Sequence, residues 1–339
     1  MAEPFKNLIS PALVRAAAPA LQRAWPAFDG ERFAALATDG LETLELKARA
    51  MHVCAALEAT LPADFASAAD VIEAALAPVE ADFAAAGPAE QADGLRGWIL
   101  WPAGEYIARH GQAQPQRALA ALHALTQRYT AEFAIRPFIV QHPALVYATL
   151  QRWTTDPSAR VRRLVSEGSR PRLPWGLRLQ ALVRDPSPTL PLLAALQDDP
   201  DDAVRRSVAN HLNDIAKDHP QRLVDWLHEY LPGAPLARRA LLRHASRTLI
   251  KQGHPGVLKA WGLGAALRGE ATLAITPRRV ALGGEITLTL PLRSTSPRPQ
   301  TLAIDEAALR AATAEMLSAR PTLTLAGRAG RGNPETLLE

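Results

Sequence analysis

The chain has 339 residues, of which 48% are hydrophobic, so it is long enough to form a large core and more than one domain. Its composition excludes a disordered chain, and its single cysteine, Cys54, excludes both a disulfide framework and a thiolate metal cluster. The start lacks the pattern of a secretory signal, and no run approaches the roughly 18 apolar residues of a membrane span. We therefore expect a cytoplasmic protein that makes no membrane contact.

Positive charge is concentrated in the middle of the chain. The formal net charge is +4, but residues 1–100 hold 7 basic and 14 acidic side chains, whereas residues 101–260 hold 22 basic and 13 acidic ones. Such asymmetry is typical of a face that binds a polyanion, joined to an acidic support. The alternative is that arginine is simply a frequent surface residue here, because lysine is scarce.

The first part of the chain predicts helices only. Ser10 is suited to be an N-cap, with Pro11 at the first helical position, and leucines and alanines then recur at three- and four-residue spacing. We expect helices within residues 12–25, 31–37, 41–60, 64–86 and 116–138.

From residue 142 the chain repeats itself at a constant offset of 43 residues. Each copy has a helix, an Asp-Pro turn (Asp156-Pro157, then Asp199-Pro200) and a second helix that begins Val-Arg-Arg. Weaker copies start at His219-Pro220 and His254-Pro255. A period of about 40 residues with two helices per unit is typical of HEAT and armadillo repeats. Residues 1–265 are therefore predicted to form an all-α HEAT-like repeat solenoid, an α-α superhelix.

The sequence changes character after this solenoid. Strands are expected at residues 271–275, 279–282 and 285–292, with a turn at Gly283-Gly284. An immunoglobulin-like sandwich needs about 7 strands, so residues 266–305 predict only a short, incomplete immunoglobulin-like β segment. Residues 306–339 read as helical and then Arg/Gly-rich, an atypical C-terminal tail.

Paired arginines open the second helix of each copy and would line one edge of a stacked array. Together with neighbouring basic residues they are candidates to neutralise the phosphates of a nucleic acid. These candidates are Arg162, Arg163, Arg170, Arg172, Arg178, Arg205, Arg206, Lys217, Arg238, Arg239, Arg243 and Lys251. The structural alternative is that one arginine of each pair binds the turn aspartate of its own or a neighbouring unit.

Three acids stand in otherwise basic or apolar helical strings: Glu132, Glu167 and Asp214. If the repeats stack, the helices that carry them are adjacent and the carboxylates converge. A carboxylate beside arginine is more often a salt bridge than a catalyst, so spacing alone favours a structural role.

Four strings carry a resemblance to a known family: FDGERFAALATDGLETLELKAR, TAEFAIRPFI, VRRLVSEGSRPRLPWGL and VRRSVANHLNDIAKDHP. They resemble the AlkC branch of bacterial DNA alkylation repair glycosylases, which are relatives of AlkD built from HEAT-like repeats. The likeness runs from about residue 5 to 305.

The resemblance implies a monofunctional DNA glycosylase that excises 3-methyladenine and 3-methylcytosine from double-stranded DNA without flipping the base. It implies Glu132, Glu167 and Asp214 as catalytic acids. We expect a monomer with no cofactor and no metal. Because an N3-alkylated base is cationic and leaves readily, the enzyme mainly needs negative charge beside the sugar. We expect these acids to be unpaired with the arginines. The alternative is a non-catalytic HEAT scaffold that binds nucleic acid or protein.

Further residues would serve such a site. Trp175 is expected to contact the lesion by stacking or cation–π attraction, with a core or loop-anchoring tryptophan as the alternative. Asn210, His211 and Asn213 flank Asp214 on its helix and are candidates to bind DNA phosphate or to orient the acid, with buried capping as the alternative. Lys217 is expected to contact phosphate rather than to form a Schiff base.

Overall fold

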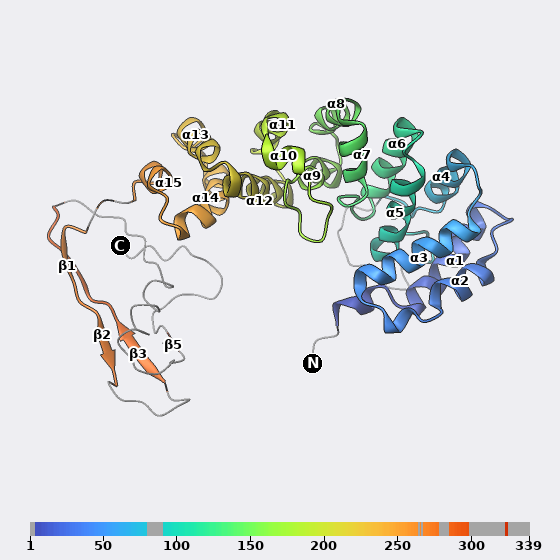
Figure 1. The fold of residues 1–339 in the computed structure, drawn as a ribbon, viewed down its shortest axis with the longest axis horizontal. Helices are drawn as coiled ribbons and strands as arrows, with labels where there is room; N and C mark the ends of the chain where they lie inside the picture. The colour runs from blue at the N-terminus through green and yellow to red at the C-terminus, as the bar shows by residue number, and fades with distance from the viewer. Residues whose placement is uncertain are drawn as a thin grey trace. The chain divides into compact units, whose positions relative to one another are not determined.

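The computed structural model describes residues 4–79, 91–263, 265, 267–277, 285–297 and 323–324 (Figure 1). The described residues form fifteen α-helices and five short strands. The chain divides into two compact units: one holds Met1–Asp218 with Pro235–Ala245, and the other holds His219–Ala234 with Ser246–Glu339. Among the described residues, no helix combines the length and the apolar character that crossing a membrane requires.

The first part of the chain is helical, as predicted. Ser10 caps the first helix, since its side chain accepts a hydrogen bond from the Leu13 amide at 3.2 Å, and Pro11 follows at the first helical position. The core between these helices is apolar and includes the fully buried rings of Phe28 and Phe33. The helices are α1 (Pro11–Ala24), α2 (Gly30–Thr38), α3 (Leu46–Thr60), α4 (Phe65–Ala74), α5 (Leu100–His110) and α6 (Pro115–Thr126), with 3-10 turns η1 (Phe5–Leu8), η2 (Leu41–Thr43) and η4 (Gly97–Ile99).

Three predicted helices differ from the structure. The helix expected over 41–60 begins only at Leu46, because residues 41–43 form the separate turn η2. The helix expected over 64–86 ends at Ala74, and its last part lies outside the described residues. The helix expected over 116–138 is broken, because α6 ends at Thr126 and α7 begins at Ile135. The break places Pro137 in the first turn of α7, where a missing amide hydrogen costs little; a continuous helix would hold it in the interior.

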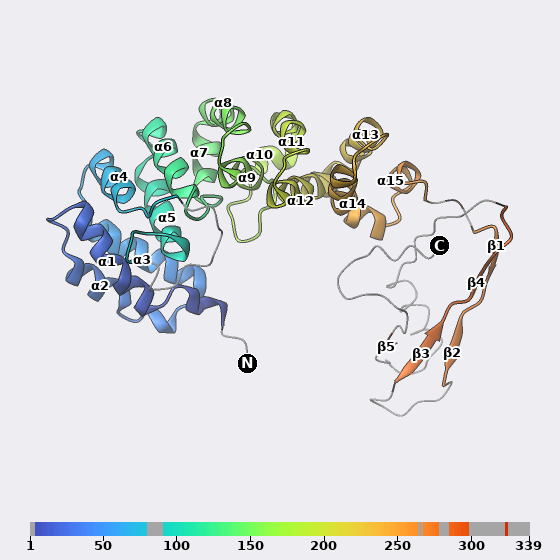
Figure 2. The ribbon, with the colours of Figure 1, turned by 180° about the vertical axis from the view of Figure 1, so that it is seen from behind.

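The two copies of the repeat stack as helix pairs, which both views of the ribbon show (Figures 1 and 2). Helix α9 packs against α8, α11 and α12. This part confirms the HEAT-like repeat prediction. Its elements are α7 (Ile135–Gln141), α8 (Pro143–Trp153), α9 (Ala159–Gly168), α10 (Gln180–Arg184), η5 (Ser187–Thr189), α11 (Leu190–Leu196) and α12 (Asp202–Asp218).

The Asp-Pro turns close by the same chemistry in both copies. The Asp156 carboxylate accepts from the Ser158 amide at 2.8 Å, and the Asp199 carboxylate accepts from the Asp201 amide at 2.9 Å. An aspartate that accepts from the amide two residues later makes an Asx turn, and the intervening proline cannot extend the preceding helix. The turn residues thus set where each second helix starts.

Three more helices follow: α13 (Pro220–Tyr230), α14 (Leu236–Lys251) and α15 (Pro255–Ala260). Helices α13 and α15 both begin with proline after histidine, as expected for repeat starts, and they pack against each other. Helix α14 runs from one compact unit into the other.

The strands form one long hairpin and one extra pairing. Strands β1 (Gly269–Ala271) and β2 (Ala274–Thr276) pair antiparallel with β4 (Leu292–Ser294) and β3 (Ile286–Thr289), respectively, in one continuous register. Between the two ladders Pro291 has no amide hydrogen to donate, but its carbonyl accepts from Thr272 at 3.2 Å. Strand β5 (Leu323–Thr324) runs parallel to β3.

The strand expected at 271–275 covers the end of β1 and the start of β2, and the strand expected at 285–292 covers β3 and the start of β4. The strand expected at 279–282, the Gly283-Gly284 turn and most of the tail at 306–339 lie outside the described residues. Within the tail, strand β5 is the described part, and it lies where the sequence predicted no strand.

Candidate active site

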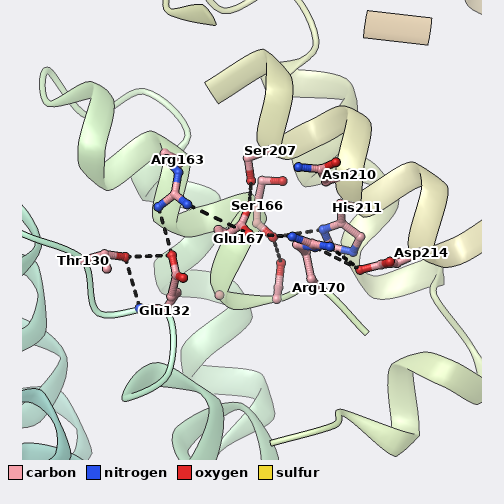
Figure 3. Close-up of polar contacts among 12 residues, drawn as sticks. Thr130, Glu132, Arg163, Ser166, Glu167, Arg170, Ser207, Asn210, His211 and Asp214 are labelled. Atoms are coloured by element: carbon pink, nitrogen blue, oxygen red, sulfur yellow. Dashed lines mark hydrogen bonds and ion pairs between the residues drawn. The ribbon is translucent and has the colours of Figure 1, made fainter. Parts of the chain in front are cut away.

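The three acids singled out in the sequence come together in the first compact unit (Figure 3). Glu167 lies near the end of α9 and Asp214 lies in α12, and these two helices pack against each other. Glu132 lies in the turn before α7 rather than in a helix, which corrects the prediction for that residue. The stacking of the repeats therefore brings the acids from three elements to one site.

Cations alternate with these acids in a continuous chain of contacts. Arg163 donates to the Glu132 carboxylate at 2.9 Å, and its other Nη lies 3.9 Å from Glu167. Arg170 donates to Glu167 at 2.6 Å and to Asp214 at 2.9 Å. Lys217 donates to the other oxygen of Asp214 at 2.9 Å. We name this set the acid–base row: Glu132, Arg163, Glu167, Arg170, Asp214 and Lys217.

The expectation that the acids are unpaired with arginines is therefore wrong. The side chains of Glu167 and Asp214 are almost fully buried. A buried carboxylate without a hydrogen-bonded counter-charge would lose its solvation uncompensated. The pairing is what allows two acids to stand close together inside the protein.

The middle of the row is closed and its ends are open. The Arg170 side chain is 9% exposed, whereas those of Arg163 and Lys217 are 26% and 42% exposed. Burial lowers the pKa of Arg170, but the adjacent carboxylates Glu167 and Asp214 outweigh it, so the pKa is raised and this cation stays charged.

Two hydroxyl groups complete the coordination of the acids and were missed by sequence reasoning. Ser207 Oγ, on α12, donates to Glu167 at 2.5 Å, and Thr130 Oγ1 donates to Glu132 at 3.0 Å. Thr130 was detectable as a hydroxyl two residues before the acid. Ser207 meets Glu167 only through the packing of α12 on α9, so no local signal marked it.

His211 is fully buried between α9 and α12. Its Nδ1 lies 3.0 Å from the Ser166 carbonyl, and its Nε2 lacks a hydrogen-bond partner among the described residues. Burial, reinforced by the charge of Arg170, lowers the pKa of His211 to about 3. The ring is therefore neutral, and its Nδ1–H donates a hydrogen bond to the Ser166 carbonyl. The ring lies inside the protein against the Ser166 carbonyl, which favours the buried alternative over the predicted contact with DNA. Asn210 Oδ1, one residue earlier, accepts from His244 Nε2 at 3.0 Å.

The first arginine of each pair binds the turns, as the structural alternative states. Arg162 forms a two-pronged ion pair with Asp199, the turn aspartate of the next copy, at 2.6 and 2.9 Å. It also donates to the carbonyls six and five residues before it, and Arg205 does the same in the second copy. These guanidinium groups hold the repeat together. Their N–H groups, which the prediction assigned to phosphate, therefore donate within the protein.

The other basic candidates differ in how available they are. Arg172 binds both oxygens of Asp218, at 2.7 and 2.5 Å. The Arg206 side chain is 71% exposed and its ion pair with Asp202 is long, at 3.3 Å. Arg243 is partly buried on α14. Of these, Arg206 is the best placed to reach a polyanion.

Trp175 stands on the loop between α9 and α10 and is 64% exposed. Its φ of 62° lies in the left-handed region, which is costly for a residue with a side chain. Its carbonyl accepts from Lys47 at 3.3 Å, and its ring centroid lies 6.4 Å from that of Phe5. Such strain at an exposed aromatic residue is typical of a functional position rather than of a core anchor. A cleft of about 470 Å³ adjoins it, lined by Pro4, Phe5, Lys6, Glu45, Leu46 and Trp175.

Arg136 anchors this loop and was not singled out in the sequence. It is fully buried, and it donates to the Leu177 carbonyl at 2.5 Å and to the Gly168 carbonyl at 2.8 Å, so it ties the loop at two points. Burial lowers the pKa of Arg136 to about 10, and the neighbouring Arg170 acts in the same direction. An arginine within the apolar string AIRPFIV was the only signal for it.

Stacked helix pairs with Asp-Pro turns and turn-binding arginines define a HEAT-like helical-repeat protein. No protein-family model matches the chain. The protein designated uncharacterized protein YhaZ of Bacillus subtilis is 36% identical over 265 residues, which cover 78% of this chain and 70% of YhaZ. The structure of Pseudomonas fluorescens alkylpurine DNA glycosylase AlkC, bound to DNA containing an abasic site analog, is 33% identical with a TM-score of 0.75. That match covers 88% of this chain and 79% of the AlkC chain. The chain belongs to the AlkC family.

Proposed function

We propose that the chain is a monofunctional DNA glycosylase that excises cationic N3-alkylated bases, such as 3-methyladenine and 3-methylcytosine, from double-stranded DNA. Membership of the AlkC family supports this, because the AlkC relative is an alkylpurine DNA glycosylase whose structure contains DNA. The protein would act as a monomer without a cofactor, in the cytoplasm and at the nucleoid.

The observation that carries the proposal is the convergence of Glu132, Glu167 and Asp214 in the acid–base row. When the bond between C1′ and a cationic base breaks, the base leaves neutral and the sugar becomes oxocarbenium-like. Fixed carboxylates beside C1′ stabilise that charge and orient the water that attacks it. A general acid is not needed, since the leaving base already carries the positive charge.

Extruding a nucleotide from the duplex costs a few kcal/mol. Carboxylates that act on the sugar from the groove avoid this cost, so we propose excision without base flipping. Trp175, exposed on its loop, would lie against the lesion, where its ring attracts a cationic base. Arg206 would contact phosphate.

The test is the identity of the product. Single-stranded DNA is methylated chemically, so that N3 of both adenine and cytosine is reached, and is then annealed to its complement. This duplex is incubated with the protein, and released bases are separated by chromatography. We expect free 3-methyladenine and 3-methylcytosine, and strands that break only after alkali because they carry abasic sites. DNA binding without any release would instead favour the non-catalytic scaffold.

Strand breakage without alkali would contradict the monofunctional proposal. Arg117→Gln is a matched control, because Arg117 also bridges two carboxylates, Asp70 and Glu73, each at 2.6 Å. We expect this variant to release base as the wild type does.

A further inference from the structure

We infer that the cations of the acid–base row divide the work: Arg170 is a positioning residue that holds Glu167 and Asp214 for catalysis, whereas Arg163 and Lys217 cover the acids until DNA phosphates draw them away. This inference rests on the proposed function. It reassigns Arg170, which the sequence suggested as a phosphate contact.

The geometry of Arg170 leaves it no reach toward DNA. Its Nη1 donates to Glu167 at 2.6 Å, and its Nε and Nη2 each lie 2.9 Å from the same oxygen of Asp214. The side chain is almost fully buried. Because a guanidinium group is planar and rigid, these contacts fix the position of one carboxylate relative to the other.

The surroundings of Arg170 hold this arrangement in place. Ser207 fixes the second oxygen of Glu167, and His211 joins α12 to α9 through the Ser166 carbonyl. Glu167 is therefore held from α12 as well as by Arg170, and the helix that carries Asp214 is fixed against α9. A site with this degree of fixation needs little reorganisation when charge develops on the sugar.

Arg163 and Lys217, toward the two ends of the row, are held less firmly than Arg170. Arg163 makes one short contact with the row's acids, to Glu132, and Lys217 makes one, to Asp214. Both are long side chains that are partly exposed, 26% for Arg163 and 42% for Lys217. When either cation leaves, its acid keeps another partner, because Thr130 still donates to Glu132 and Arg170 still donates to Asp214. A phosphate on either side of a lesion would therefore compete for these cations without leaving an acid unpartnered.

The charges explain why such an exchange helps catalysis. The row holds three acids and three cations, so with every contact made it is neutral and offers little to a cationic sugar. If Arg163 and Lys217 turn to phosphates, three carboxylates remain with Arg170 alone, and the row becomes negative. DNA binding itself would then generate the field that stabilises the transition state.

The experiment separates binding from chemistry. Release of 3-methyladenine is followed under single-turnover conditions at saturating protein, and Kd is measured on duplex DNA containing an abasic site analog. For Arg170→Gln we expect the rate to fall about 100-fold while Kd changes little, and low concentrations of guanidinium to restore part of the rate. Sodium chloride at equal concentration controls for salt.

For Arg163→Gln and Lys217→Gln we expect the main loss in Kd, with a salt dependence flatter by about one unit of slope for each removed phosphate contact. The matched control Arg117→Gln should leave both the rate and Kd as in the wild type.

If Arg170→Gln does not fold, Arg170→Lys takes its place. Lysine keeps the positive charge but cannot bridge both acids, so the rate of base release should still fall.

Several results would overturn the inference. One such result is that Arg170→Gln or Arg170→Lys releases base at the wild-type rate. Another is that either variant loses affinity for DNA while its rate of base release stays unchanged. Loss of rate without loss of affinity in Arg163→Gln and Lys217→Gln would also contradict it. A wild-type protein that releases no base would instead refute the proposed function, and this inference with it.

Discussion

The two copies of the 43-residue repeat share their turns and differ in their second helices. In both, an aspartate closes the turn and the first arginine of the pair donates to the same two turn carbonyls. Beyond that point α9 ends at Gly168 and gives way to the Trp175 loop, whereas α12 continues to Asp218.

The second arginine and the residues after it also diverge. Arg163 lies against the acids, while its counterpart Arg206 is exposed to solvent. At the positions of Glu167 and Arg170 the second copy has Asn210 and Asn213. The shared residues thus build the repeat, and the residues that depart from it build the site.

The largest expected effect concerns an acid that only the first copy has. Glu167→Gln gives this position the amide character of the second copy, removes one negative charge and should lower the rate of base release about 100-fold. Single-turnover release measures the effect. Glu73→Gln, a carboxylate paired with the control residue Arg117, should change the rate little. Equal losses in the two variants would contradict the comparison.

The shared turn arginines should differ in how much they stabilise the fold. Arg162→Ala leaves the buried Asp199 carboxylate without its ion pair and should cost about 3 kcal/mol. Arg205→Ala loses carbonyl contacts and an exposed partner, Asp202, and should cost about 1 kcal/mol. Urea unfolding measures both. A larger cost for Arg205→Ala than for Arg162→Ala would contradict the claim that the buried ion pair of Arg162 with Asp199 sets the difference.

His211 should make the stability depend on pH. In the unfolded chain a histidine binds a proton below about pH 6.5, whereas the native His211, with a pKa of about 3, does not. The stability that the neutral ring contributes is present above pH 6.5 and is lost as the pH falls toward 3, by about 2 kcal/mol at pH 5. Urea unfolding at pH 7 and pH 5 should show this loss in the wild type. In His211→Gln the free energy of unfolding should fall less between pH 7 and pH 5. An equal fall in the variant and the wild type would contradict the claim that the native His211 ring is neutral.

The smallest expected effect lies in the second copy. Arg206→Ala removes an exposed cation, so we expect weaker binding on all DNA sequences and a salt slope reduced by about one. The free energy of unfolding should change little. Fluorescence anisotropy at several salt concentrations measures the slope, and a loss confined to damaged DNA would exclude a phosphate contact.

The repeat could be predicted because its signals are local. Proline after aspartate or histidine, and arginines at fixed distances from the turn, mark helix starts without reference to the rest of the chain. Glu167 and Asp214 stood out locally as acids in basic helical strings, but their catalytic role was expected only from the family resemblance. The break before α7 was missed, although Pro137 marked it.

The pairing within the site could not be predicted from spacing. Whether Arg170 meets a phosphate or an acid depends on the register of α9 against α12, which places Asp214 beside its Nε. The same register buries His211 and brings Ser207 to Glu167. Arg136 was missed because its partners are backbone carbonyls, which are present in every sequence.

One measurement tests the central claim, that the converging acids perform the chemistry. Wild type and Asp214→Asn are compared for release of 3-methyladenine under single-turnover conditions, with the affinity for abasic DNA measured in parallel. We expect release to be slower by about 100-fold in Asp214→Asn, with similar affinity. Equal rates in the two proteins would remove Asp214 from the mechanism and contradict the claim.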